Sequence, residues 1–172
     1  MVQSAFERKI KPDLIYFTEP FQRENTEWIQ SIESSDVSYE NISANQLEKI
    51  SFTKSPSGIV AVCNLPEQQL PDLNQNRWVY LDRIADPGNM GTILRSAAWF
   101  GLNHVALSAD CVDPFNPKVV RAGMGAHFGL SIYSNIELNC FADSLTLIGA
   151  DHRGNDVSDF KSPKKFVLVL GS

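Results

Sequence analysis

Trp78-Val-Tyr-Leu-Asp82, with the downstream segments Asp86-Pro-Gly-Asn-Met-Gly91 and Thr92-Ile-Leu-Arg-Ser-Ala-Ala-Trp-Phe100, is the stretch of sequence that decides the fold. The first segment is a β-prone apolar run, and the second is a glycine turn. The third has the apolar spacing of a helix, which Gly101 can end. A strand that passes through a tight turn into a helix predicts one step of an α/β domain.

The same alternation of strands and helices continues after this step. Further strands are expected at 105–107, 145–149 and 166–170, and Pro117 is a suitable first residue for a second helix. This alternation predicts a mostly parallel, open sheet with right-handed crossovers.

The first third of the chain predicts a smaller α/β module. Short β-prone runs occur at 13–18, 37–39 and 58–63, and one helix is expected to begin at Pro20. Ser43 followed by Gln46 is the pattern of a capping box at the start of another helix. The resulting order is β-α-β-α-β.

Residues 65–77 contain two prolines and many amide side chains, which is typical of a linker. We therefore expect a small α/β domain at residues 1–64, a linker at 65–77 and a second α/β domain at 78–172.

The composition is that of an ordinary globular protein, with 43% hydrophobic and 20% charged residues. A net charge of −5 argues against general adhesion to nucleic acid but leaves room for a local basic patch. The three cysteines are odd in number and lack metal-ligand spacing. We therefore expect no disulfide framework and no metal site, and a reducing cytoplasmic location. No stretch approaches membrane-spanning length, so no membrane partner is expected.

The glycine turn at Asp86–Gly91 is the first candidate for a binding site, because helix N-termini present free N–H groups. Taken alone, this pattern is equally typical of a plain βα turn. Arg95 and Arg121 follow in two successive predicted helices. They could converge at the carboxyl edge of the sheet, where paired guanidinium groups suit phosphate.

Read together, Leu81–Gly101 resembles motif 1 of the SpoU (TrmH-type) RNA methyltransferases. The segment Asp113–Phe128 looks like the continuation of that pattern, and Phe166-Val-Leu-Val-Leu-Gly-Ser172 looks like the first half of motif 2. The resemblance covers residues 78–172. The segment Ser51–Cys63 is similar to part of the ribosomal-protein-like domain that often precedes the catalytic domain in this family.

The resemblance implies an α/β-knot methyltransferase domain that uses S-adenosylmethionine to methylate a ribose 2′-hydroxyl of ribosomal or transfer RNA. It also implies a homodimer for the full-length protein. The matching positions are as follows: Asn89 and Arg95 as catalytic residues, Arg121 and Lys118 as RNA-binding residues, and Ala150, Leu170 and Gly171 as cofactor-binding residues.

The chain departs from the family pattern because the rest of motif 2 and all of motif 3 are absent from the 172 residues. We therefore expect an incomplete knot domain that neither binds the cofactor well nor methylates RNA by itself. A non-catalytic RNA- or ribosome-binding module is the alternative. A third reading, an unrelated nucleotide-binding α/β domain, lacks a recognisable set of phosphate-binding residues.

Overall fold

The structure is a computed structural model that describes residues 1–8, 10–53, 55–151, 153–154 and 156–171. The chain separates into two compact units, Met1–Pro66 and Glu67–Ser172. Each unit is described by itself. Ser172, at which the motif 2 segment was expected to continue, lies outside the described residues.

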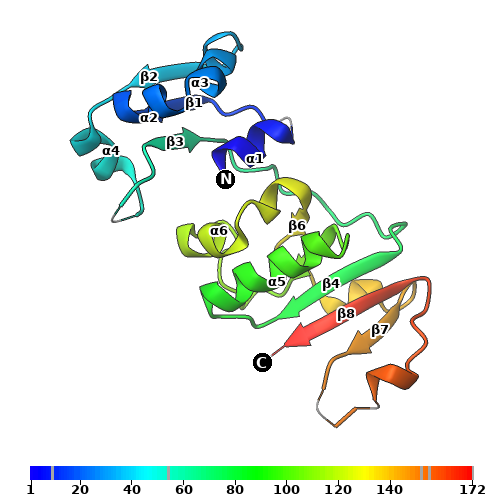
Figure 1. Ribbon diagram of the computed structural model, residues 1–172. Coiled ribbons are helices and arrows are strands. Elements are labelled where there is room, and N and C mark those ends of the chain that lie inside the picture. Colours follow the sequence, from blue (N-terminus) through cyan, green and yellow to red (C-terminus); the bar gives the residue numbers. More distant parts are fainter. Residues whose placement is uncertain (9, 54, 152, 155, 172) are drawn as a thin grey trace. The chain divides into compact units, whose positions relative to one another are not determined.

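The first unit is a three-stranded sheet with helices (Figure 1). In the sheet order β2-β1-β3, β1 is parallel to β2 and antiparallel to β3. Its core places Ile15 and Phe17 of the central strand against Ile29 and Ile32. The elements in chain order are α1 (Val2–Glu7), β1 (Leu14–Phe17), α2 (Glu19–Glu24), α3 (Thr26–Glu33), β2 (Ser38–Asn41), α4 (Ala44–Ile50) and β3 (Ile59–Val62).

Two local expectations for this unit have different outcomes. The capping box is confirmed, because the Gln46 N–H donates to the Ser43 hydroxyl and the Ser43 N–H donates to the Gln46 side chain. The single helix expected from Pro20 is instead two helices, α2 and α3. The break falls at Asn25, whose backbone leaves the helical region and whose amide donates to the Phe21 carbonyl at 3.0 Å. Such a local side-chain bond competes with a continuous helix.

The second unit is a five-stranded sheet in the order β6-β5-β4-β8-β7, and every strand pair in it is parallel. The predicted mostly parallel α/β architecture is therefore confirmed. The elements are β4 (Arg77–Asp82), α5 (Pro87–Trp99), β5 (His104–Leu107), α6 (Pro117–Gly123), η1 (Ala126–Gly129), β6 (Ser131–Tyr133), η2 (Leu138–Phe141), β7 (Thr146–Gly149), η3 (Val157–Asp159) and β8 (Phe166–Gly171). Strand β6 was not predicted, since three residues give too little alternation to detect.

The division between the units falls after Pro66, inside the predicted linker 65–77. The later part of that range belongs with the second unit. Leu73 packs against its core, and the Gln75 carbonyl accepts a hydrogen bond from the Trp78 indole at 3.3 Å. Strand β4 already begins at Arg77.

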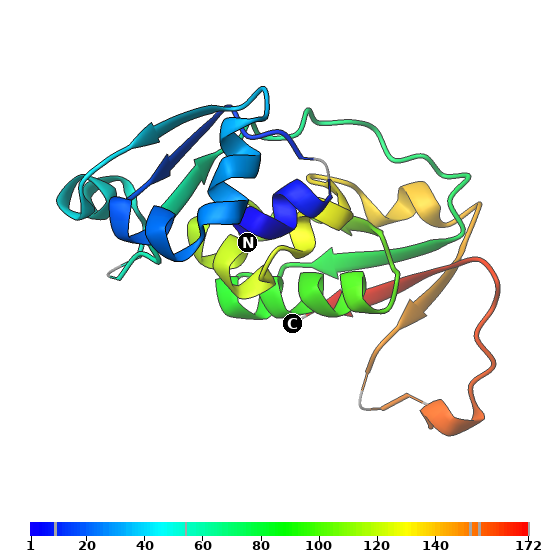
Figure 2. The same cartoon turned by 45° about the horizontal axis from the view of Figure 1, so that its top comes forward.

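Alternation along β4 divides the second unit into two apolar layers. Val79 and Leu81 face a cluster that includes α5 and α6, whereas Trp78 and Tyr80 face a second cluster with Phe141. Successive strand side chains point to opposite faces, so a fully buried central strand needs apolar residues at every position. The segment that joins β7 to β8 extends away from α5 and α6 (Figure 2).

Helices α5 and α6 approach each other with almost no space between their backbones. A Cβ added at Gly91 would lie 2.4 Å from the Ala122 Cβ and 2.7 Å from the Val119 carbonyl oxygen. Only glycine permits this approach, so Gly91 determines how closely the two helices pack.

Candidate active site at the carboxyl edge of the sheet

The three predicted cofactor residues gather at the carboxyl ends of β7 and β8. Gly171 lies opposite Asp82 in the strand register, and the Ala150 N–H donates to the Val169 carbonyl at 3.2 Å. Ala150 and Gly171 are exposed, whereas Leu170 packs partly against the core on the side of α5. Ligands of open α/β sheets bind at this edge.

The space around the strand ends at this edge shows whether a cofactor could be accommodated there. A Cβ added at the neighbouring Gly149 would meet no atom within 4 Å, and the three atoms nearest to one added at Gly171 all belong to Asp82, at 3.4–3.6 Å. Small residues leave the backbone groups of both strand ends accessible. The residues present therefore fit a ligand that hydrogen-bonds to backbone, such as a nucleoside.

Asn89 lies in the first turn of α5, on the same edge. Asp86 is the N-cap of the helix, and its carboxylate accepts a hydrogen bond from the Asn89 backbone N–H at 2.7 Å. This cap satisfies one of the free helix donors and neutralises part of the positive end of the helix. The Asn89 side chain is exposed and lies beside the capped turn.

Arg95 lies further back, eight residues after Pro87, which is about 12 Å along the helix axis. Its guanidinium Nη1 donates to the Met124 Sδ at 3.1 Å, and Met124 is the left-handed C-cap of α6. The structure therefore does not show Arg95 at the carboxyl edge. Asn89 and Arg95 share one helix but lie about 9 Å apart along it.

The two predicted RNA-binding residues lie on α6. Lys118 is exposed in its first turn, where the Asn116 side chain caps the Lys118 N–H at 2.9 Å. Arg121 is half-buried one turn later, and its carbonyl accepts from the Met124 N–H at 3.2 Å. Met124 is therefore a neighbour of both Arg95 and Arg121, so the two arginines lie near the C-terminal end of α6.

Two residues that the sequence did not single out hold the turns of this edge together. The Ser108 hydroxyl accepts from the Arg83 N–H at 2.9 Å, and the Cys111 sulfur accepts from the Ile84 N–H at 3.4 Å. Arg83 has a positive φ of 54°, an uncommon conformation for this residue type. In the sequence, the only signals for these contacts are a serine directly after the strand that ends at Leu107 and a cysteine three residues after that serine.

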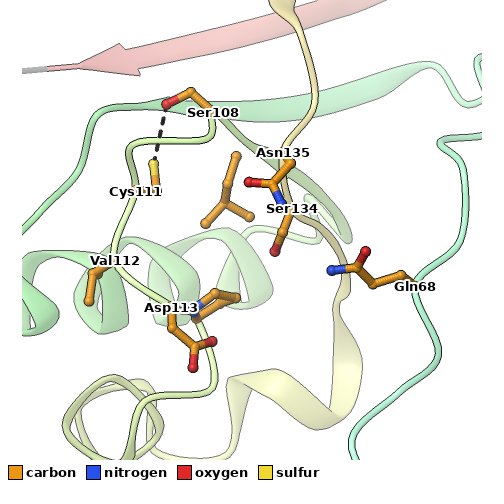
Figure 3. Close-up of a pocket in the computed structure, with 9 residues that line it drawn as sticks. Gln68, Ser108, Cys111, Val112, Asp113, Ser134 and Asn135 are labelled. Atoms are coloured by element: carbon orange, nitrogen blue, oxygen red, sulfur yellow. Dashed lines mark hydrogen bonds between the residues drawn. The ribbon is translucent and has the colours of Figure 1, made fainter.

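A hollow of about 280 Å³ opens beside this cross-link, at the carboxyl ends of β5 and β6. Its apolar wall consists of Leu107, Val112 and Pro114. Figure 3 shows Gln68, Ser134 and Asn135 on the side opposite Cys111 and Val112.

Two histidines of this unit have structural contacts. His127 Nε2 lies 2.8 Å from the Pro114 carbonyl, and a Cβ added at Gly123 would lie 3.0 Å from His127 Nδ1. Burial lowers the pKa of His127, although its hydrogen bond to Pro114 opposes that shift. Burial also lowers the pKa of His104, whose ring packs on Trp78, while Asp72 opposes the shift.

Within the described ranges, no group of three or more His, Cys, Asp or Glu side chains is arranged to hold a metal ion. None of the described helices combines the length and apolar character needed to cross a membrane.

Comparison with known proteins matches both units. The profile of the SpoU rRNA Methylase family matches residues 76–172, more than half of the chain. This chain belongs to the SpoU rRNA methylase family. The profile described as RNA 2′-O ribose methyltransferase substrate binding matches residues 1–69 of the same SpoU chain. The resemblance in the sequence is therefore confirmed.

Named relatives of this SpoU chain include mitochondrial and bacterial enzymes. It is 39% identical over 109 residues to the mouse mitochondrial rRNA methyltransferase 3, covering 59% of this chain and 26% of that protein. It is 29% identical over 137 residues to the Bacillus subtilis 23S rRNA (guanosine(2553)-2′-O)-methyltransferase RlmP, covering 76% of this chain and 54% of that protein. The chain thus spans only about a quarter to a half of these relatives.

Solved structures of SpoU and TrmH proteins share the fold. A TrmH-family structure from Porphyromonas gingivalis is 26% identical, with a TM-score of 0.81, over 99% of this chain and 68% of that one. The SpoU methyltransferase AviRb from Streptomyces viridochromogenes, solved with AdoMet, is 22% identical, with a TM-score of 0.80, over 99% of this chain and 69% of that one. The AviRb likeness establishes the fold alone.

Proposed function

We propose that the protein to which this chain belongs transfers a methyl group from S-adenosylmethionine to a ribose 2′-hydroxyl of ribosomal or transfer RNA. The observation that carries this proposal is that one parallel sheet brings together the segments that resemble motif 1 and motif 2. Asn89 and Arg95 lie on the helix after β4, and Ala150 and Gly171 lie at the ends of β7 and β8. A substrate-binding domain of the same family precedes them.

Arg95 has a defined task in this reaction. S-Adenosylmethionine would supply an electrophilic methyl group, and the 2′-hydroxyl loses its proton as it attacks. A guanidinium stays protonated in proteins and is a poor base. In the proposed reaction the Arg95 guanidinium leaves the Met124 sulfur and turns towards the substrate. There it orients the hydroxyl by hydrogen bonding and offsets charge as an alkoxide develops. Asn89, exposed in the first turn of α5, provides a second polar group for the ribose.

Lys118 and Arg121 support RNA binding through phosphate contacts. Lys118 is exposed, and both residues lie on α6, which packs directly against the helix that carries Asn89 and Arg95. Each phosphate contact with single-stranded RNA adds roughly 0.7 to the slope of log affinity against log salt. Lys118→Ala is therefore expected to weaken RNA binding and to reduce that slope.

The exposure of Ala150 and Gly171 leaves the cofactor edge open to water in residues 1–172. We expect weak binding of S-adenosylmethionine by these residues alone, because a pocket normally buries most of its ligand. Calorimetric titration measures this directly. Micromolar affinity of residues 1–172 by themselves would contradict the expectation.

A second copy of the chain is the proposed partner of the outer surface of α5 and α6. Trp99, Phe100 and Met124 are 85%, 74% and 66% exposed, and Arg95 connects Met124 to α5 one turn before Trp99. Adjacent exposed large apolar side chains mark interaction surfaces. Light scattering of the full-length protein should show a dimer that Trp99→Ser weakens. A monomer at micromolar concentration would overturn this assignment.

The experiment that tests the proposed function uses the full-length protein with labelled S-adenosylmethionine and transcribed ribosomal and transfer RNA. The expected product is RNA that resists alkaline cleavage at one nucleotide, since methylation blocks the 2′-oxygen. RNA binding without methyl transfer would instead support the non-catalytic RNA- or ribosome-binding module.

The location in the cell remains a prediction. Cysteine usage predicts the cytoplasm, whereas the mouse relative is named as a mitochondrial protein. Imaging of the tagged full-length protein decides between the two compartments.

A further inference from the structure

The hollow at the ends of β5 and β6 is separate from the proposed cofactor edge. In the sheet order β6-β5-β4-β8-β7, two strand spacings separate β5 from β8. This corresponds to about 10 Å. Leu107 ends β5 at the hollow, whereas Gly171 ends β8 at the cofactor edge. The two places can therefore hold different ligands at the same time.

The lining of the hollow disfavours a phosphate as its occupant. Among the described lining residues there is no lysine or arginine, and Asp113 adds a carboxylate. The remaining polar groups are the neutral amides of Gln68 and Asn135 and the hydroxyls of Ser108 and Ser134. A neutral group with both donors and acceptors suits such a lining.

The hollow has the walls that a flat ring needs. Leu107, Val112 and Pro114 supply the apolar part of the lining. Figure 3 shows Gln68 and Asn135 on the side opposite Val112. An amide offers one donor and one acceptor side by side, which pairs with the edge of a nucleobase. Single-stranded RNA is recognised through unstacked bases that are contacted in this way.

Asn135 is held in place by its backbone. It has a φ of 59°, and the next residue, Ile136, donates its N–H to the Leu107 carbonyl at 2.9 Å. The backbone of Asn135 is thus fixed beside the end of β5. None of the side-chain hydrogen bonds seen among the described residues involves Gln68 or Asn135, so both amides remain available for a ligand.

We propose that this hollow binds one unstacked nucleobase of the RNA substrate, with Gln68 and Asn135 contacting the base edge. The proposal rests on the proposed function, because RNA is the partner that brings the base. Lys118 follows Pro114 by four residues and supplies a positive charge for the adjoining phosphate. Base binding and phosphate binding are therefore assigned to different side chains.

The test uses the full-length protein and a labelled single-stranded octa-adenylate with one central 2-aminopurine. Fluorescence anisotropy measures RNA binding, and 2-aminopurine fluorescence measures unstacking of the base. We expect the fluorescence to rise on binding, because none of the described lining residues is aromatic and the base leaves its stacked neighbours.

Three substitutions separate the base contact from other effects. Asn135→Gly keeps the left-handed backbone and removes the amide. Gln68→Ala removes the second amide, and Gln69→Ala is the matched control because Gln69 does not belong to the lining. The first two variants should lose the fluorescence rise and bind RNA about three- to tenfold more weakly, with an unchanged salt slope. The control should behave as wild type.

Several outcomes would overturn the proposal. RNA binding without a fluorescence rise, or equal behaviour of Gln68→Ala and Gln69→Ala, removes the base site but leaves the proposed function intact. Absence of octamer binding by the wild-type protein removes the base site, whereas the proposed function is decided separately by the methylation assay on ribosomal and transfer RNA. If S-adenosylmethionine suppresses the fluorescence rise while anisotropy stays high, the hollow belongs to the adenine of the cofactor instead.

Discussion

The helix pair α5–α6 and the strand edge β7–β8 belong to one unit but differ in how tightly they are packed. At Gly91 the two helices meet with no room for a methyl group, whereas at Gly149 an added methyl group would meet nothing within 4 Å. Both regions carry residues of the proposed active site. The helix pair is complete within this chain, and the strand edge remains exposed.

This difference separates two requirements of a methyltransferase. A catalytic side chain needs a rigid support, because small displacements lose much of its effect. A cofactor edge needs accessible backbone groups until the ligand covers them. Substitutions in the helix pair should therefore change stability and catalysis, whereas substitutions at the strand edge should mainly change cofactor binding.

The largest expected effect concerns Arg95 on the helix pair. In the full-length enzyme, Arg95→Lys should lower kcat by about 100- to 1,000-fold, because a lysine keeps the charge but loses the planar pair of donors. Single-turnover methylation at saturating RNA measures this effect. Near-normal turnover would show that the planar guanidinium has no special role.

The next effect compares the two glycines directly. Gly91→Ala should destabilise the second unit by about 2–3 kcal/mol, because the new Cβ overlaps Ala122 and the Val119 carbonyl. Gly149→Ala is the matched substitution in open space and should leave the free energy of unfolding almost unchanged. Urea denaturation of both variants measures the contrast. Equal stability would mean that the helices separate easily.

A smaller effect is expected at the turn that begins α5. Asp86→Ala removes the acceptor of the Asn89 N–H and should cost about 1 kcal/mol. Asp86→Asn keeps an acceptor in the same place and should recover most of the stability. If Asn is no better than Ala, the charge of Asp86 rather than its cap is important.

The smallest effect concerns the pH dependence of the closely packed region. Burial lowers the pKa of His127 in the folded protein, so the unfolded chain binds a proton first as the pH falls. Stability should be full above about pH 6.5, the ordinary pKa of histidine, and should decrease as the pH falls towards 5.5.

His127→Gln should reduce this pH dependence, and His104→Gln, whose pKa is also lowered by burial, should reduce the remainder. Thermal unfolding at pH 7.5 and 5.5 measures both. The aspartates with lowered pKa values titrate below this window. A wild-type melting temperature that does not change between the two pH values would contradict the prediction.

Local signals in the sequence predicted the elements of the site well. Gly101 after a helix and Pro117 at a helix start have the expected positions. These features depend on contacts within a few residues, which the sequence displays directly. The start of α5 was predicted wrongly, because the helix begins at Pro87 and includes most of the expected turn Asp86–Gly91. Strand β6 was not predicted because its pattern is short. The break at Asn25 was not predicted because it depends on one side-chain hydrogen bond.

The sequence by itself determined the fold class, the parallel sheet and the family, because alternating patterns and motif residues are local properties. Only the tertiary structure decided where Arg95 lies, since its bond to Met124 joins residues 29 positions apart. The tertiary structure alone also brought Gln68 and Asn135 to the same hollow and Ser108 against Arg83. Contacts of such long sequence separation follow from the packing of whole elements, and no local pattern encodes them.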